Sequence, residues 1–371
     1  MSYKISKYCL RSSFIIGFLL LYQLVSAQYN FSPVESWVKA NLKNLGGRAV
    51  VMIYKDGKVI YNESFNKLGM KQKIGAKMIA RKTGKDPKQM LQDYDDQSRI
   101  SLASCSKWLS AALVMTFVDE GKLSLSDTIG KFLPVMSANG KGAITIAQCL
   151  SHTTGIKGGS VKDSKEWMNK IGSMDEAIAL IAKQPVESAP GQSFHYSSVG
   201  LQLAAAVIEQ ISGKDFEALF ADRIAQPCGM TQTDFGHKNV PLPAGGAQGS
   251  ATDYLNFLQM ILHKGMFNGK RVLSAKSIDL MQQDHKAGVK VIQSPAGAGN
   301  WGYGFGEWTF EETVAGKPSD AVTSPGLFGS FPWVDNKKNY AGLLFTFNLK
   351  YKSRNELYRE LKHIVDGIVS Q

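Results

Sequence analysis

The chain has 371 residues, of which 44% are hydrophobic, so it is long enough to bury a large core in one or two domains. It has 43 Lys and Arg residues against 31 Asp and Glu residues, which gives a formal net charge of +12, and much of that charge is local. The four cysteines form no CxxC pair and the chain has no H-E-x-x-H motif. These observations argue against a disulfide scaffold and against the common zinc sites, so we expect no metal and no other cofactor.

The first 27 residues have the pattern of a secretory signal peptide. Three basic residues precede an apolar run over 14–25, and Val25-Ser26-Ala27 is a small-residue cleavage site. The run is shorter than the roughly 20 residues that span a bilayer, although a retained anchor is the alternative. We therefore expect residues 28–371 to be one exported domain, periplasmic or secreted, with a net charge reduced by three to +9.

Two alternating runs rich in β-branched residues, 48–54 and 58–65, are joined at Asp56-Gly57 and predict a hairpin. The next region, 66–97, is polar and basic. Eight Lys and Arg residues and a single acid lie within 67–88. We interpret it as a surface excursion, with a weak association with anionic surfaces as the alternative. Because 67–88 contains no aromatic residue, stacking on nucleic acid bases is not supported.

The tetrapeptide Ser104-Cys105-Ser106-Lys107 lies where this polar region turns into a helical pattern. Residues three apart share a helix face, so the Lys107 amine can take the Ser104 proton. At a helix start, free backbone N–H groups can stabilise an oxyanion, and apolar neighbours favour a neutral lysine. The same spacing occurs at 36–39 and 64–67, but neither place has comparable surroundings.

The middle of the chain is mainly helical, whereas strands return near the C-terminus. Residues 328–334 and 340–347 predict a second strand pair, followed by an amphipathic helix at 354–369. The expected central helices are 107–120, 146–150, 174–182, 199–211, 216–224, 253–262 and 275–281. Strands at both ends predict an α+β fold with one antiparallel sheet flanked by helices, and an inserted helical lobe at roughly 128–250.

Several stretches, in this order, resemble the serine β-lactamase and penicillin-binding-protein superfamily, in particular its class C-like esterases, peptidases and β-lactamases. The stretches that carry the resemblance are 104–107, 119–127, 144–156, 190–200 and 245–254. Together they fall within roughly 45–350. The resemblance implies a β-lactamase/transpeptidase-like fold and a serine hydrolase that forms an acyl-enzyme without a cofactor.

The second motif of that superfamily, Y-x-N, falls on Tyr196-Ser197-Ser198. The resemblance implies that Tyr196 is the second proton-transfer residue, acting between Ser104, Lys107 and the leaving group. A tyrosinate would need nearby positive charge, which Lys107 could provide. Ser198 stands where the superfamily usually has Asn, and its shorter side chain weakens the expected contact with a substrate amide.

The third motif, K-T-G or H-x-G, aligns with Ser324-Pro325-Gly326. By resemblance, Ser324 and Gly326 contact the substrate, and the N–H groups of Leu327 and Ser104 form the oxyanion hole. The usual cation is replaced by Ser324, which argues against substrates that present a carboxylate.

We therefore expect an exported esterase or amidase rather than an efficient β-lactamase, acting on a small ester, amide or peptide-like molecule and not on nucleic acid. The alternatives are a D-amino-acid peptidase or β-lactamase, and a non-catalytic cell-wall or ligand-binding protein that keeps the fold. His152 is expected to be structural and His195 to point away from Tyr196. Of the cysteines, Cys105, Cys149 and Cys228 are expected to be buried thiols, with one bridge as the alternative. The sequence does not indicate an oligomeric state.

Overall fold

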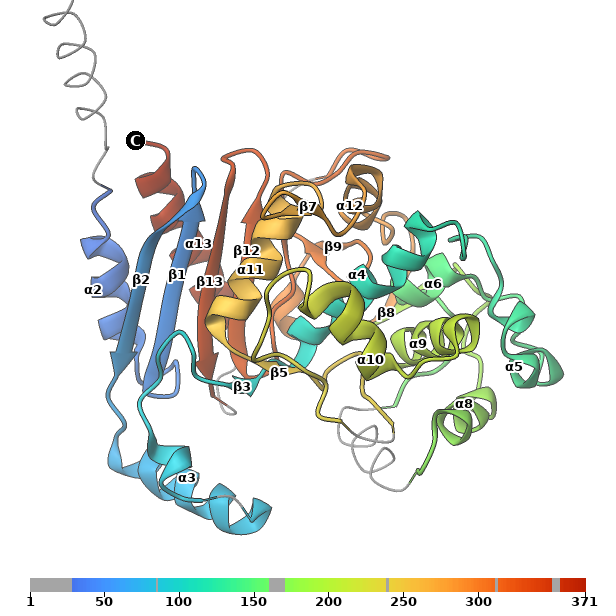
Figure 1. The fold of residues 1–371 in the computed structure, drawn as a ribbon, viewed down its shortest axis with the longest axis horizontal. Helices are drawn as coiled ribbons and strands as arrows, with labels where there is room; N and C mark the ends of the chain where they lie inside the picture. Colours follow the sequence, from blue (N-terminus) through green and yellow to red (C-terminus); the bar gives the residue numbers. More distant parts are fainter. Residues whose placement is uncertain (1–28, 85, 160–170, 238–239, 311–312, 349–353) are drawn as a thin grey trace, which may run out of the picture.

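The computed structural model describes residues 29–371 except 85, 160–170, 238–239, 311–312 and 349–353 (Figure 1). The expected signal peptide lies outside these described residues. Within them, no helix combines the length and the apolar character that crossing a bilayer requires.

Seven antiparallel strands form the central sheet, and both ends of the chain contribute to it (Figure 1). β13 lies between the N-terminal strand β1 and β12, so the predicted sheet built from both termini is confirmed. The predicted hairpin is present, and Asp56 and Gly57 both adopt the positive φ values, 51° and 81°, that such a turn requires. In sheet order the strands are β2 (Lys58–Asn66), β1 (Arg48–Lys55), β13 (Tyr340–Phe347), β12 (Gly329–Asp335), β11 (Ala321–Thr323), β10 (Trp308–Thr309) and β9 (Gly302–Tyr303).

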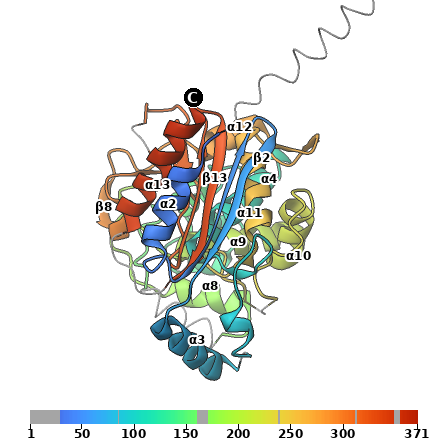
Figure 2. The same ribbon diagram turned by 90° about the vertical axis from the view of Figure 1, so that its left-hand side faces the viewer.

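Helices cover both faces of this sheet, because alternate side chains of its central strands are apolar on either side. In β1, Ala49 and Val51 belong to the core under α2 and α13, whereas Val50 and Met52 belong to the core that includes α4, α9 and α11. Figure 2 shows α2 and α13 next to each other on one face. The flanking helices are α2 (Ser32–Asn41), α13 (Arg354–Val369) and α11 (Ala251–Leu262).

The helical lobe lies beside the β9–β12 side of the sheet (Figure 1). The helix α4 packs against α9 of this lobe and is buried from Ser106 to Phe117, which explains why its sequence is mainly apolar on all sides. The other helices among the described residues are α3 (Met70–Thr83), α4 (Ser106–Asp119), α5 (Pro134–Ala138), α6 (Ile146–Leu150), α8 (Met174–Ala182), α9 (Val199–Ser212), α10 (Phe216–Phe220) and α12 (Ala275–Met281).

Three short strand pairs and several short helical turns lie outside the central sheet in the described part of the chain. The pairs are β3 (Ile100–Ser101) with β5 (Gln248–Gly249), β4 (Ser193–His195) with β8 (Lys290–Gln293), and β6 (Met266–Phe267) with β7 (Lys270–Arg271). The turns are η1 (Gln89–Leu91), η2 (Ala103–Cys105), η3 (Ile129–Lys131), η4 (Ala221–Ala225) and η5 (Ala296–Ala298).

The structure differs from the sequence-based prediction in two segments. The predicted helix at 216–224 ends at Phe220, and a π-helical turn, η4, follows it. The basic region 66–97, for which no helix was predicted, contains the helix α3. Gln72 caps the start of α3 by accepting a hydrogen bond from the Gly69 amide at 2.7 Å, and Gly84 ends it in the left-handed conformation.

Candidate active site

Ser104 lies in the one-turn helix η2, which runs directly into the buried helix α4. The strand before it is held by pairing with β5, and the Leu102 amide donates to the carbonyl oxygen of Ala247 at 2.9 Å. Ala103 adopts a positive φ of 46°, which is unfavourable for a residue with a side chain. Ala103 and Cys105 are buried while Ser104 is partly exposed, so this constrained turn keeps Ser104 accessible.

Lys107 lies one turn further along and is 4% exposed. Its Nζ is 3.3 Å from the Ser104 hydroxyl oxygen and donates to the carbonyl oxygen of Ala244 at 2.7 Å. Burial lowers the pKa of Lys107 from 10.5 to about 7, because a charged amine loses its hydration there. A substantial fraction of Lys107 is therefore neutral near pH 7, and only the neutral amine can accept a proton from Ser104.

Tyr196 reaches the same place from the end of β4. Lys107 Nζ lies 4.6 Å from the centre of the Tyr196 ring, and the Ser104 side chain is near enough to the phenol to lower its pKa. The Tyr196 amide donates to the carbonyl oxygen of Gln293 in β8 at 3.0 Å, which fixes the backbone. Burial raises the pKa of Tyr196, and the nearby Ser104 side chain opposes this rise only in part.

The surroundings of Tyr196 bear on whether it can act as a tyrosinate. A tyrosinate would need the positive charge of Lys107, but a lysine that is partly neutral near pH 7 gives less of this support, and burial favours the phenol. In the resting enzyme the phenol is protonated, so it can donate a proton but cannot serve as the base.

The two histidines near the site, His152 and His195, are not hydrogen-bonded to Ser104 or Lys107 among the described residues. The buried His152 is 3.0 Å through Nε2 from the Tyr303 hydroxyl, and its ring centre is 4.7 Å from that of Tyr196. Burial lowers the pKa of His152 well below its ordinary value, so the ring is neutral and supports the phenol by packing. His195 is hydrogen-bonded to the Glu187 carboxylate instead of to the residues around Ser104.

Ser324 is buried beside the turn that carries Ser104. It is 2% exposed, and its hydroxyl lies 3.2 Å from the carbonyl oxygen of Ser104 and 3.0 Å from that of Gly306. The short side chain turns toward these backbone oxygens, and the substrate contact expected of Ser324 stays a prediction. Ser324 links the turn that carries Ser104 to the β9–β10 connection.

Gly326 also serves the packing of η2. A Cβ atom at this position would lie 2.6 Å from the carbonyl oxygen of Leu102 and 3.2 Å from Cys105 Sγ. Its amide donates to the carbonyl oxygen of Ser330 at 2.8 Å. The close approach predicted at Gly326 is thus made by the protein's own backbone rather than by a substrate.

The next residue, Leu327, is 51% exposed beside this contact. Among the described residues, the amide groups of Ser104 and Leu327 have no hydrogen-bond acceptor. Two such N–H groups near the partly exposed Ser104 hydroxyl have the character of an oxyanion hole.

Ser198 lies just before α9 begins, is partly exposed and is not hydrogen-bonded to the other expected site residues within the described ranges. Residues that sequence reasoning missed lie behind the site. Ser106 accepts a hydrogen bond from the Ala247 amide at 3.0 Å, and the Tyr254 hydroxyl donates to the carbonyl oxygen of Cys105 at 2.9 Å. Ala247 and Tyr254 both lie in the 245–254 stretch. The sequence alone could not predict these hydrogen bonds, because a backbone group can be the partner whatever the residue type.

A cation does lie near Leu327, although not at the position of Ser324. The Arg354 guanidinium, at the start of α13, donates to the carbonyl oxygens of Leu327 and Asn348. Arg354 is partly buried. Its terminal nitrogens are therefore already engaged by the backbone.

Three side chains elsewhere could share a cation. Glu217, Asp234 and His237 offer ligand atoms that all lie within 4.8 Å of one another. Asp234 is ion-paired with Arg99, however, and the Glu217 carboxylate accepts the Phe235 amide. The carboxylates of this cluster therefore already have partners within the protein, and we propose no cation site there.

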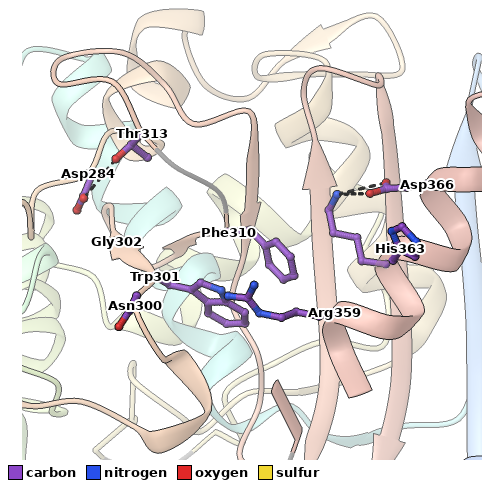
Figure 3. A pocket seen from close by; sticks show the side chains of 10 residues that line it. Asp284, Asn300, Trp301, Gly302, Phe310, Thr313, Arg359, His363 and Asp366 are labelled. Carbon is purple, nitrogen blue, oxygen red and sulfur yellow. Dashed lines mark hydrogen bonds and ion pairs between the residues drawn. The ribbon is translucent and has the colours of Figure 1, made fainter. Parts of the chain in front are cut away.

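A separate cavity of about 660 Å³ lies beside α13 (Figure 3). Arg359 extends across Trp301 in it, and Lys362 is ion-paired with Asp366. None of the expected site residues lines this cavity, and its lining includes neither serine nor cysteine. It is therefore distinct from the site at Ser104.

The cysteines in the described part of the chain, Cys105, Cys149 and Cys228, are free and buried, as expected.

Comparison with known proteins extends over most of the chain. The family model described as Beta-lactamase matches residues 36–365. Protein Rv1367c of Mycobacterium tuberculosis is 28% identical over 285 residues, which cover 62% of this chain and 71% of that protein. Penicillin-binding protein 4 of Amycolatopsis lactamdurans is 27% identical over 298 residues, which cover 71% of this chain and 76% of that protein.

Solved structures have the same fold. A candidate beta-lactamase from Bacteroides dorei DSM 17855 superposes with a TM-score of 0.76 at 25% identity, over 92% of this chain and 100% of that one. EstCE1, a hydrolase with promiscuous acyltransferase activity, superposes with a TM-score of 0.67 at 19% identity, over 90% and 100% of the two chains. The resemblance and the fold expected from the sequence are thereby confirmed: this chain belongs to the beta-lactamase family and is a serine hydrolase with the β-lactamase/penicillin-binding-protein fold.

Proposed function

We propose that this enzyme cleaves a neutral ester or amide through an acyl-enzyme on Ser104. The observation that carries the proposal is the contact of three groups. Lys107 Nζ is 3.3 Å from the Ser104 hydroxyl and 4.6 Å from the Tyr196 ring centre, and the same serine is near enough to the phenol to lower its pKa. A nucleophile, a base with a lowered pKa and a protonated phenol are the groups that acyl transfer needs.

In the proposed acylation step, Ser104 Oγ attacks the substrate carbonyl carbon and its proton passes to neutral Lys107. The carbonyl electron pair moves to oxygen, where the amides of Ser104 and Leu327 stabilise the negative charge. When the intermediate collapses, the bond to the leaving group breaks and Tyr196 supplies a proton to the departing alcohol or amine. Tyr196 is reprotonated from Lys107.

Deacylation follows the same route in reverse. Water attacks the acyl carbon and gives its proton to the neutral lysine. The proton then returns from Lys107 to Ser104 Oγ as the bond between Oγ and the acyl carbon breaks and the carboxylic acid is released. This step distinguishes a hydrolase from a protein that is acylated only once.

The surroundings of Ser324, in the third motif, favour a substrate without a charge. Ser324 is buried against two carbonyl oxygens, so it cannot contribute a charge or a free donor to a substrate carboxylate. The fold is compatible with more than one leaving group. EstCE1 is a hydrolase with acyltransferase activity, and a candidate 6-aminohexanoate-dimer hydrolase from Bacillus anthracis superposes with a TM-score of 0.68 at 17% identity.

A second candidate function, hydrolysis of carboxylate-bearing substrates such as β-lactams or D-amino-acid peptides, is favoured by Arg354. Its guanidinium touches the Leu327 carbonyl and would attract a carboxylate if it were released from the backbone. We rank this function second, because such a substrate would have to compete with two existing hydrogen bonds.

We also propose that the enzyme works outside the cytoplasm. The basic residues, the apolar run over 14–25 and the cleavage site at Val25-Ser26-Ala27 support export. N-terminal sequencing of the chain recovered from culture would test it. A mature end at Gln28 is expected, and a retained N-terminus would contradict cleavage.

The substrate proposal is tested with a side-by-side panel of p-nitrophenyl butyrate, nitrocefin and a D-alanyl-D-alanine peptide. We expect the highest kcat/KM for the ester, and a loss of about a thousandfold or more in Ser104→Ala. Arg354→Gln should leave ester hydrolysis within about threefold of the wild type. A best substrate that carries a carboxylate, together with its selective loss in Arg354→Gln, would replace the first proposal with the second.

A further inference from the structure

The helix α3 presents an apolar stripe that its own chain leaves uncovered. Met70, Ile74 and Met78 are 74%, 52% and 65% exposed. They follow one another at intervals of four, so they lie along one side of the helix. Single exposed apolar residues are common on protein surfaces, but three in line on one helix form a continuous stripe.

Cationic side chains border this stripe. At about 100° per residue, Lys73 and Lys77 lie on one flank and Lys71 lies on the other, while Arg81 falls within the same face. All four are exposed, and no ion pair involving them occurs among the described residues. The sequence of α3 contains no acidic residue. The outer face is therefore both apolar and strongly positive.

The opposite face of α3 is already packed against the body of the protein. Ala76 and Ala80 are buried, and α3 contacts η1. η1 is held in turn by Arg48, which donates to the carbonyl oxygens of Met90 and Gln92 at 3.3 and 2.6 Å. The helix projects from the body of the protein (Figures 1 and 2). No other segment among the described residues covers its apolar stripe.

We propose that α3 docks on an anionic lipid bilayer, with its apolar stripe in the boundary between head groups and acyl chains. In this orientation the flanking lysines meet the lipid phosphates, which matches the chemistry of helices that lie on membranes. With 14 residues the helix is about 21 Å long, too short and too charged to span the bilayer. A soluble acidic polymer would use the lysines but would leave the apolar stripe in water.

Docking in this way would also orient the enzyme. Figure 1 shows α3 at the end of the sheet where β3 lies, and β3 leads into the turn that carries Ser104. The end of the molecule that contains this turn would face the lipid. The proposal does not depend on which ester or amide the enzyme cleaves.

The test is co-sedimentation of the chain from Gln28 onward, which contains all described elements, with phosphatidylcholine vesicles and with equal mixtures of phosphatidylcholine and phosphatidylglycerol. The stripe variant is Met70→Gln with Ile74→Gln and Met78→Gln, which keeps helix formers in place. The charge variant is Lys71→Glu with Lys73→Glu and Lys77→Glu. The matched controls carry three changes each at exposed positions elsewhere: Val135→Gln with Val186→Gln and Val314→Gln, and Lys270→Glu with Lys276→Glu and Lys290→Glu.

We expect binding to the anionic vesicles only, weakened by salt, and a loss of about tenfold or more in both α3 variants but in neither control. Circular dichroism and unchanged labelling by a fluorophosphonate would show that the variants are folded. Absence of binding by the wild type, or equal binding by the stripe variant, would overturn the proposal. Equal loss in the charge controls would do the same, because binding would then follow net charge alone.

Insertion is tested separately with a fluorophore on Ile74→Cys. The described cysteines are all buried, so the new thiol is the accessible one in that part of the chain. A polarity-sensitive nitrobenzoxadiazole label at this position should shift to the blue with anionic vesicles, whereas the same label on Lys276→Cys should not. An unshifted label at position 74 on bound protein would contradict insertion of the stripe.

Discussion

At the scale of single residues, the environment of Lys107 decides what the site can do. Its ammonium group has exchanged water for the Ala244 carbonyl and the Ser104 hydroxyl, and this loss of hydration lowers its pKa to about 7. The phenol of Tyr196 responds in the opposite direction to the same burial, so its pKa rises. Burial of the two side chains therefore makes Lys107 available as a base and Tyr196 available as a proton donor at the same pH.

The first prediction concerns the pH dependence of kcat/KM for a neutral ester. Because the pKa of Lys107 lies below its ordinary value, the lysine is protonated and inactive below about pH 7, and becomes a base above it. We expect kcat/KM to fall by about tenfold per pH unit below that value and to level off above it. Lys107→Arg, which stays charged, should be inactive throughout. A rate independent of pH between 5 and 9 would contradict this role.

The second prediction separates the positioning of Ser104 from stability. In Ser324→Ala, the hydroxyl that contacts the Ser104 and Gly306 carbonyl oxygens is lost, which should lower the free energy of unfolding by about 1 kcal/mol. Because the turn around Ser104 loosens, we also expect kcat to fall severalfold with KM unchanged.

Ser330→Ala is the matched control for this second prediction. Ser330 is equally buried, but its hydroxyl donates to the Thr346 carbonyl oxygen at 3.1 Å in the neighbouring strand. The control should lose similar stability in urea unfolding without a change in kcat. Equal kinetic effects in the two variants would show that Ser324 has only a structural role.

At the scale of elements, the parts fixed by local chemistry could be predicted from the sequence. The hairpin at Asp56-Gly57 follows from the positive φ that such a turn needs, and α6 begins at Ile146 because Thr145 caps it. The contacts of Ser324 could not be predicted, because one partner, Gly306, is brought to it by tertiary packing. The helix α3 was not predicted, because the lysines between Met70, Ile74 and Met78 make the segment polar overall and the four-residue spacing of its apolar residues is hard to recognise.

At the scale of the whole molecule, the site depends on joining distant parts of the chain. β13 places the C-terminal strands beside the N-terminal hairpin, and α13 then covers the sheet next to α2. Apolar alternation at both ends predicted this sheet, and the prediction is confirmed. The sequence did not indicate that a buried ion pair, Lys362 Nζ to Asp335 at 2.7 Å, links α13 to β12.

The third prediction tests this link. Lys362→Met leaves the Asp335 carboxylate buried without its nearest cation, so the free energy of unfolding should fall by about 3 kcal/mol. The control is Lys39→Met, which breaks an exposed pair with Glu35 and should change stability by less than about 1 kcal/mol. Urea unfolding at pH 7 measures both. An equally small effect for Lys362→Met would show that α13 docks through its apolar residues alone.

The central claim, that Ser104 is acylated with the help of Lys107, is tested most directly by intact-protein mass spectrometry after reaction with a fluorophosphonate. We predict a single adduct in the wild type, mapped to Ser104 by peptide sequencing. No adduct should form on Ser104→Ala, and labelling of Lys107→Met should be about a hundredfold slower or more. An unlabelled wild type under conditions that label a known serine hydrolase, or an adduct on any other residue, would contradict the account.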